Sequence, residues 1–287
     1  MCGVIFLFMD YAFIAPTSYL KPLELDKEPF HLLLAHLLER DEEYLNFYKQ
    51  LPDNHIKLMD NSAYELYRQG KPMFDGNKLI ELAKQVRANY IVMPDYPGEP
   101  AGKTAASALE FGPQFKQAGY NTFFVPQSRI GHLEEYISSF AWAASSPIVD
   151  YIGMSILGIP NAFGVDGNDL QRYVSRLHMF QILENRGLLS LARNNGKKIH
   201  CLGMTDGPNE IMLLEKYIRS RAITSWDSSA PIWAGIEGVS FDNSPTGLVN
   251  GKVKSHVDFG VKYDESKLPL IKANISYINS LIKGLAQ

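Results

Sequence analysis

Cysteine is scarce in this chain of 287 residues, which contains only two. Cys2 and Cys201 form neither a CxxC nor a CxC motif, so they cannot build a structural zinc site by themselves. Such sparing use of cysteine fits a protein of the reducing cytoplasm. The sequence therefore predicts neither a metal nor any other cofactor.

Long apolar runs are also missing. Residues 4–9 are apolar, but no basic flank precedes them and Asp10 follows at once. The run is too short for a signal or membrane segment, and we expect it to form a buried strand. No membrane partner is expected.

Neither sign of charge is in large excess, since the formal net charge is −3. This balance argues against a protein that coats nucleic acid indiscriminately, although a local basic groove remains compatible with it. No GxGxxG or GxxxxGK[ST] motif follows the early strands, so no dinucleotide or P-loop site is indicated. With 46% hydrophobic and 21% charged residues, the composition is that of one globular domain spanning residues 1–287.

What the sequence does contain is a regular alternation of strand and helix patterns. After a proline-punctuated loop at 16–29, helical spacing alternates with short β-favouring runs. Strands are expected at 4–9, 56–59, 90–93, 121–125, 151–152, 198–202 and 223–226, and helices at 30–51, 77–88, 104–118, 132–144, 170–191, 209–221 and 267–285. Residues 238–241 and 256–261 compete for an eighth strand. About eight such units predict an α/β fold, and they favour a closed (β/α)8 barrel over an open doubly wound sheet.

Polar residues and glycines follow these strands directly. Because the carboxyl ends of parallel strands meet at one mouth of a barrel, we expect these residues to converge although they are distant in sequence. Three converging carboxylates raise the pKa of at least one of them unless a substrate or a hydrogen-bond donor separates them, and this arrangement suits general acid and base chemistry. The alternative is that some only cap turns or helices, above all Asp95 before Tyr-Pro-Gly. The residues are Asp60, Asp95, Gln127, Gly153, Gly203 and Asp227.

Six short motifs carry a resemblance to a known family, and their ordered set is more specific than any one of them. They are MDNSAY at 59–64, VMPD at 92–95, VPQ at 125–127, YIGM at 151–154, HCLG at 200–203 and WDSSAP at 226–231. In this order and context they resemble the tRNA-guanine transglycosylase family over roughly residues 56–231. The resemblance implies a barrel enzyme that removes guanine from a polynucleotide and installs a free 7-deazaguanine base.

The resemblance also implies the catalytic roles. Asp227 matches the nucleophile that attacks the anomeric carbon and holds the sugar as a covalent glycosyl-enzyme. Asp60 matches the general acid and base that assists the departing guanine and then takes a proton from the incoming base. An oxocarbenium-like transition state does require an anionic nucleophile and a proton donor near the leaving group, as in retaining glycosidases.

The base-binding roles come from the same comparison. Asp95 and Gln127 match residues that read the hydrogen-bonding edge of the base, and ionised Asp95 is a natural acceptor for guanine's N–H donors. Gly153 with Met154 matches a backbone contact, and Gly203 closes the adjoining HCLG motif. Tyr64 and Leu202 match the two residues that sandwich the ring. The alternative is that Leu202 belongs to barrel packing and that Tyr64 begins the next helix.

Departures from the family bear on the substrate. Residues 232–287 contain no cysteine, so the family's zinc-binding subdomain is missing. Ile232 replaces the arginine that usually follows the family's proline, while Asn61 and Ala63 alter its Ser/Gly-rich turn. These losses put tRNA in doubt and resemble the compact phage-type enzymes that insert deazaguanines into DNA.

Three functions remain open from the sequence: a DNA-guanine transglycosylase, which is preferred, a tRNA-guanine transglycosylase without zinc, and a catalytically silent barrel that binds nucleic acid. A duplex target would have to be unstacked to reach the site. Candidate phosphate contacts are Arg68, Lys71, Arg129 and residues 252–256, each of which is otherwise solvated surface. Whether the chain forms a homodimer is left open.

Overall fold

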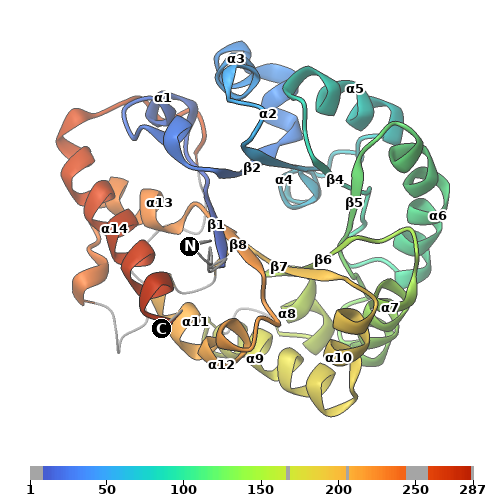
Figure 1. Ribbon diagram of the computed structural model, residues 1–287. Helices are drawn as coiled ribbons and strands as arrows, with labels where there is room; N and C mark the ends of the chain where they lie inside the picture. Colours follow the sequence, from blue (N-terminus) through green and yellow to red (C-terminus); the bar gives the residue numbers. More distant parts are fainter. Residues whose placement is uncertain (1–8, 166–168, 205–206, 244–257, 286–287) are drawn as a thin grey trace, which may run out of the picture.

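Short apolar and β-favouring runs form eight parallel strands in the computed structural model, which describes residues 9–165, 169–204, 207–243 and 258–285. The strands within these parts are β1 (Asp10–Phe13), β2 (Phe30–Leu34), β3 (Ile56–Asp60), β4 (Tyr90–Val92), β5 (Asn121–Phe124), β6 (Tyr151–Ser155), β7 (Lys198–Leu202) and β8 (Ser225–Ser228). They pair in the order β1-β8-β7-β6-β5-β4-β3-β2. Because β1 and β2 also lie next to each other, the sheet is a nearly closed ring (Figure 1). The predicted (β/α)8 barrel is confirmed.

Helices surround the ring of strands (Figure 1). They are α1 (Thr17–Leu20), α2 (Ala35–Arg40), α3 (Glu42–Gln50), α4 (Ala63–Arg68), α5 (Gly76–Val86), α6 (Ala101–Gln117), α7 (Leu133–Ser145), α8 (Gly158–Phe163), α9 (Asp169–Asn185), α10 (Leu188–Asn194), α11 (Pro208–Leu213), α12 (Glu215–Arg219), α13 (Ala230–Ile236) and α14 (Leu268–Leu285). Aspartates begin two of the outer helices: Asp41 accepts from Tyr44 N at the start of α3, and Asp75 accepts from Lys78 N at the start of α5. The short 3-10 helices are Leu25–Lys27, Phe241–Asn243 and Glu265–Lys267.

Alternate strand residues face two different apolar layers, as the two-residue period of a strand requires. Leu32, Leu58 and Val92 belong to a cluster inside the barrel. Leu33 and Met59 belong to the larger cluster between the strands and the surrounding helices. Both faces of these three strands are therefore buried.

The first two strands differ from the prediction. Residues 4–8 of the expected first strand lie outside the described residues, and Asp10, which was expected to follow that strand, instead begins β1 and pairs with Ser225. Residues 30–51 were predicted as one helix, but Phe30–Leu34 is β2 and only the remainder is helical. All five residues of β2 are buried, and a short apolar run that is buried on both faces has no period that separates strand from helix.

Neither candidate for an eighth strand is one in the described residues. Residues 238–241 form a turn that leads into a 3-10 helix, residues 256–257 lie outside the described parts, and 258–261 are irregular. Two predicted helices are each divided into two: 170–191 into α9 and α10 at Gly187, and 209–221 into α11 and α12 at Leu214. The loop at 16–29 contains α1 and a 3-10 turn, and α8 was not predicted.

The last helix, α14, packs against α13, which directly follows the end of β8. Buried Asn274 joins the two, because its Nδ2 donates to Pro231 O at 3.1 Å and to Val239 O at 3.0 Å, and its Oδ1 accepts from Phe241 N at 2.9 Å. Gly235 lies directly against the backbone of Ile271, where a Cβ atom would have no room. The C-terminal helix thus fixes the chain that leaves Asp227.

Candidate functional site at the carboxyl ends of the strands

A cavity of about 1080 Å³ opens where the strands end. Four lining residues with polar side chains lie at or just after strand ends and were predicted from the sequence: Asp60, Asp95, Gln127 and Asp227. Asp60 closes β3, whereas Asp227 lies in β8, and the two strands are separated around the ring by β2 and β1. Residues more than 150 positions apart therefore line one cavity from different parts of its wall.

The turn after Asp60 is built by side-chain hydrogen bonds to the backbone. Asn61 Oδ1 accepts from Ala63 N at 2.8 Å, and Asp60 Oδ2 accepts from Ser62 N at 3.0 Å. Ser62 has a left-handed backbone with φ of 62°, and its hydroxyl accepts from His36 N at 3.1 Å. Asparagine and serine stabilise this turn by local bonds where glycines would do so by conformational freedom. The departures at Asn61 and Ala63 are thus compatible with a tight strand-to-helix turn.

Asp95 is buried and holds two amide donors. Asn61 Nδ2 donates to its Oδ1 at 2.7 Å, and Gln127 Nε2 donates to its Oδ2 at 2.6 Å. Burial raises the pKa of Asp95 to about 6, and the two amide donors oppose that rise. Near neutral pH the group is a carboxylate whose remaining lone pairs are available to N–H donors. Asp95 thus accepts hydrogen bonds from residues that follow two other strands, and its role in base binding stays a prediction.

Asp227 has a different environment from the other acids of the cavity. Its Oδ1 lies 2.8 Å from Nε2 of His200 and accepts from Gly203 N at 3.3 Å. Both contacts described here fall on the same carboxylate oxygen. His200 and Asp227 are both buried, and they lie on neighbouring strands β7 and β8.

Asp60 is surrounded by negative charge. Burial and the neighbouring Glu65, Asp95 and Asp227 raise the pKa of Asp60 well above its ordinary value, against the single opposing bond from Ser62 N. Glu65, in the first turn of α4, lines the same cavity, and burial raises its pKa to about 7. The raised pKa of Asp60 favours its protonated form, whereas Asp227 is held by contacts with His200 and Gly203 N.

The remaining predicted site residues divide into two groups. Tyr64, Leu202 and Gly203 line the cavity. Gly153 and Met154 are not among its lining residues: the Met154 side chain is fully buried between the sheet and the helices. A Cβ atom on Gly153 would come within 3.0 Å of Phe123, Leu202 and Val125. Glycine therefore leaves room for Leu202, and the backbone contact expected from Gly153 and Met154 stays a prediction.

Sequence reasoning missed His200 and Glu65. His200 is the first residue of HCLG, and a polar residue two positions before cavity-lining Leu202 has the same inward direction on a strand. That spacing is a signal that would have found it. Glu65 follows Asp60 by five residues. Neither the strand period nor the helix period predicts that the two side chains share a cavity, because the turn at Ser62 lies between them.

Basic residues lie at the rim of the cavity as well as away from it. Arg68 lines it and donates to the Tyr64 hydroxyl at 2.9 Å, and Arg172 lines it from α9. Arg129, a predicted phosphate contact, pairs with Glu135 at 3.1 Å. Lys71 is exposed, and residues 252–256 lie outside the described parts of the chain. The rim therefore has positive charge above an acidic floor.

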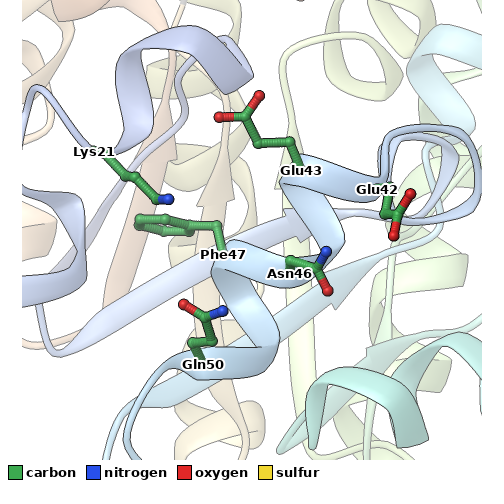
Figure 2. A pocket seen from close by; sticks show the side chains of 6 residues that line it. All are labelled: Lys21, Glu42, Glu43, Asn46, Phe47 and Gln50. Atoms are coloured by element: carbon green, nitrogen blue, oxygen red, sulfur yellow. The ribbon is translucent and has the colours of Figure 1, made fainter.

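A second, shallower hollow of about 520 Å³ lies on the outer surface along α3 (Figure 2). Helix α3 and Lys21 line it, and no strand end contributes.

In the described parts of the chain, no group of three or more His, Cys, Asp or Glu side chains is arranged to hold a metal ion. No helix in those parts has the length and apolar character needed to cross a lipid bilayer.

Fold and cavity together define a class: a (β/α)8-barrel protein with an acidic cavity at the carboxyl ends of its strands. No protein-family model matches the chain, and no curated protein matches it significantly.

Proposed function

We propose that this protein exchanges guanine in a polynucleotide for a free 7-deazaguanine base through a covalent aspartyl-glycosyl intermediate. One observation carries the proposal: Asp60 and Asp227 line the same cavity in unlike environments. Burial and neighbouring acids raise the pKa of Asp60, whereas Asp227 lies in hydrogen-bond contact with His200 and Gly203 N. Pairs of acids in unlike environments are the usual basis of acid and nucleophile roles in glycosyl transfer.

In the first half of the reaction, an Asp227 oxygen bonds to the anomeric carbon while the bond from that carbon to guanine N9 breaks. Protonated Asp60 gives its proton to the leaving base, which departs as neutral guanine. In the second half, the ionised Asp60 takes the N9 proton of the incoming base. That nitrogen then attacks the anomeric carbon and displaces Asp227 as a carboxylate, so both aspartates return to their starting states.

Base recognition follows from the groups that surround the cavity. The Asp95 carboxylate is an acceptor for the N1–H and exocyclic amine of guanine, donors that a 7-deazaguanine shares. Gln127 holds that carboxylate at 2.6 Å and supplies the second polar group. Tyr64 and Leu202 supply the two faces between which a flat ring stacks. Replacing N7 by carbon leaves all of these contacts unchanged, so the site accepts the departing and arriving bases alike.

DNA is the preferred polynucleotide because the cysteine-free sequence after Pro231 lacks the family's zinc-binding subdomain. The positive groups Arg68 and Arg172 at the rim suit a phosphate backbone. A tRNA substrate is the second candidate. A silent barrel is disfavoured because Asp60 and Asp227 are both retained and line one cavity.

Incubation of the protein with labelled guanine, or with a labelled 7-deazaguanine, and either DNA or tRNA tests the proposal. We expect label in DNA, and nucleoside mass spectrometry of DNA from cells that express the protein should show a deazaguanine. Label in tRNA but not in DNA would reverse the substrate preference. Absence of exchange into both would favour the silent barrel.

A further inference from the structure

A row of four hydrogen-bonded side chains runs from the cavity into the barrel interior. Asp227 Oδ1 lies 2.8 Å from His200 Nε2, His200 Nδ1 lies 2.7 Å from Ser225 Oγ, and Ser225 Oγ lies 3.1 Å from Tyr151 Oη. All four residues are buried. The imidazole also contacts the rings of Phe30 and Phe123. Both ring nitrogens of His200 thus have fixed partners, and the ring plane is held by aromatic packing.

The reaction proposed above restricts the form of this histidine. When Asp227 becomes an ester it loses its negative charge, and a protonated imidazole would then be a buried cation without a counter-charge. A neutral imidazole avoids this cost when Nε2–H donates to Asp227 and Nδ1 accepts the one proton of the Ser225 hydroxyl. The Ser225 oxygen then accepts from the Tyr151 hydroxyl and does not donate to it. The partner of one ring nitrogen sets the role of the other.

We propose that His200 is a positioning residue for Asp227, an inference that rests on the proposed function. Its Nε2–H fixes Oδ1 and leaves Oδ2 as the oxygen that bonds to the sugar. The same N–H, together with Gly203 N, stabilises the charge that returns to Asp227 when the incoming base displaces it. Ser225 and Tyr151 hold the imidazole in the form that donates toward the cavity.

The two halves of the reaction respond differently to this hydrogen bond. A donor on the carboxylate lowers its reactivity as a nucleophile but improves it as a leaving group. Removal of the donor therefore slows breakdown of the adduct more than its formation, and the adduct accumulates. A histidine that only fills space predicts no such imbalance between the two rates.

The experiment measures formation and breakdown of the covalent adduct separately, with a guanine-containing oligonucleotide and then a chase of free base. His200→Leu removes the donor, His200→Gln retains an amide N–H, and Ser225→Ala removes the partner of Nδ1 while keeping the imidazole. His178→Leu on α9 is the matched control, because His178 is exposed. Thermal unfolding of each variant reports whether it is folded.

For His200→Leu we expect breakdown to slow by roughly 10- to 100-fold, the scale of losing one donor to a reacting oxygen, with a larger steady-state fraction of adduct. His200→Gln should recover part of the rate, Ser225→Ala should be intermediate, and KM for the free base should stay unchanged in all three. Wild-type rates in folded His200→Leu, or equal slowing of both steps, would overturn the role of His200 while leaving the proposed function intact. Failure of the unmodified protein to form an adduct would overturn the proposed function itself.

Discussion

Burial of the acids in the cavity has a cost to the folded protein that can be measured at single residues. Glu65 has a folded-state pKa of about 7, above its ordinary value of 4.5, because burial disfavours its charged form. A raised acid pKa lowers stability at pH values above the folded pKa. The penalty fades as pH falls from about 7 toward 4.5, below which both folded and unfolded states hold the proton.

Glu65→Gln should therefore stabilise the protein at pH 8 by roughly 1–3 kcal/mol, since each unit of pKa shift corresponds to about 1.4 kcal/mol. The gain should disappear near pH 4.5. Urea unfolding at the two pH values measures it, with exposed Glu43→Gln as the matched control. A gain of equal size at both pH values would show that burial of the charge is not its cause.

Asp95 gives base binding a definite pH dependence. Its pKa of about 6 means that the carboxylate acceptor is present above pH 6 and is lost as pH falls through that value. Affinity for free guanine or a 7-deazaguanine should accordingly weaken between pH 7 and pH 5. Asp95→Asn should weaken binding at pH 8 by roughly 10- to 100-fold, the scale of a hydrogen bond to a charged group, and should remove the pH dependence.

Calorimetric titration of the free base from pH 5 to pH 8 checks this, with exposed Asp26→Asn as the matched control. If Asp95→Asn retained the wild-type pH profile, another group would be the acceptor.

The strand-end position of Asp95 was predictable from the sequence, because VMPD ends a β-favouring run. Its two amide partners were not, since Asn61 and Gln127 reach it from other strands.

At the scale of elements, the alternation of patterns was enough to predict the barrel, but not every strand. β3 to β8 were predicted at or near their observed positions because polar or small residues follow short β-favouring runs. β2 was hidden in a leucine-rich segment that continues directly into α2, and the strand cannot be separated from the helix without its neighbours β1 and β3. The inward direction of His200 could have been read from its spacing to Leu202, but its contact with Asp227 could not, because that contact depends on β8 lying beside β7.

The contact between α13 and α14 provides a prediction at this scale. Asn274→Ala removes three hydrogen bonds of a buried side chain and leaves backbone groups of Pro231, Val239 and Phe241 without that partner. We expect a loss of roughly 2–4 kcal/mol in the free energy of unfolding. Exposed Asn46→Ala on α3 should change it by less than about 0.5 kcal/mol. Denaturant unfolding measures both, and equal stabilities would contradict the role of Asn274.

At the scale of the whole molecule, the barrel brings together residues whose positions in the chain say nothing about their distance in space. The ring places β3 and β8 on one cavity, with a row of buried polar side chains below Asp227 and arginines at the rim. The two halves of the proposed reaction need this arrangement, the polynucleotide and the free base. The cavity is about 1080 Å³, which is enough for a base and its attached sugar.

Asp60→Asn should separate binding from chemistry across this cavity. An amide cannot carry the proton between bases, so exchange should slow by at least roughly 100-fold, the lower range of general acid–base contributions. Binding of the free base should stay measurable by calorimetry. Exchange at the wild-type rate would remove Asp60 from the mechanism.

Intact-protein mass spectrometry of the chain, quenched after incubation with a guanine-containing oligonucleotide, tests the central claim most directly. The account predicts a species heavier by the oligonucleotide less one guanine, with the attachment mapped to Asp227 by peptide analysis, and no such species for Asp227→Asn. An adduct that persists in Asp227→Asn, or attachment at another residue, would contradict it.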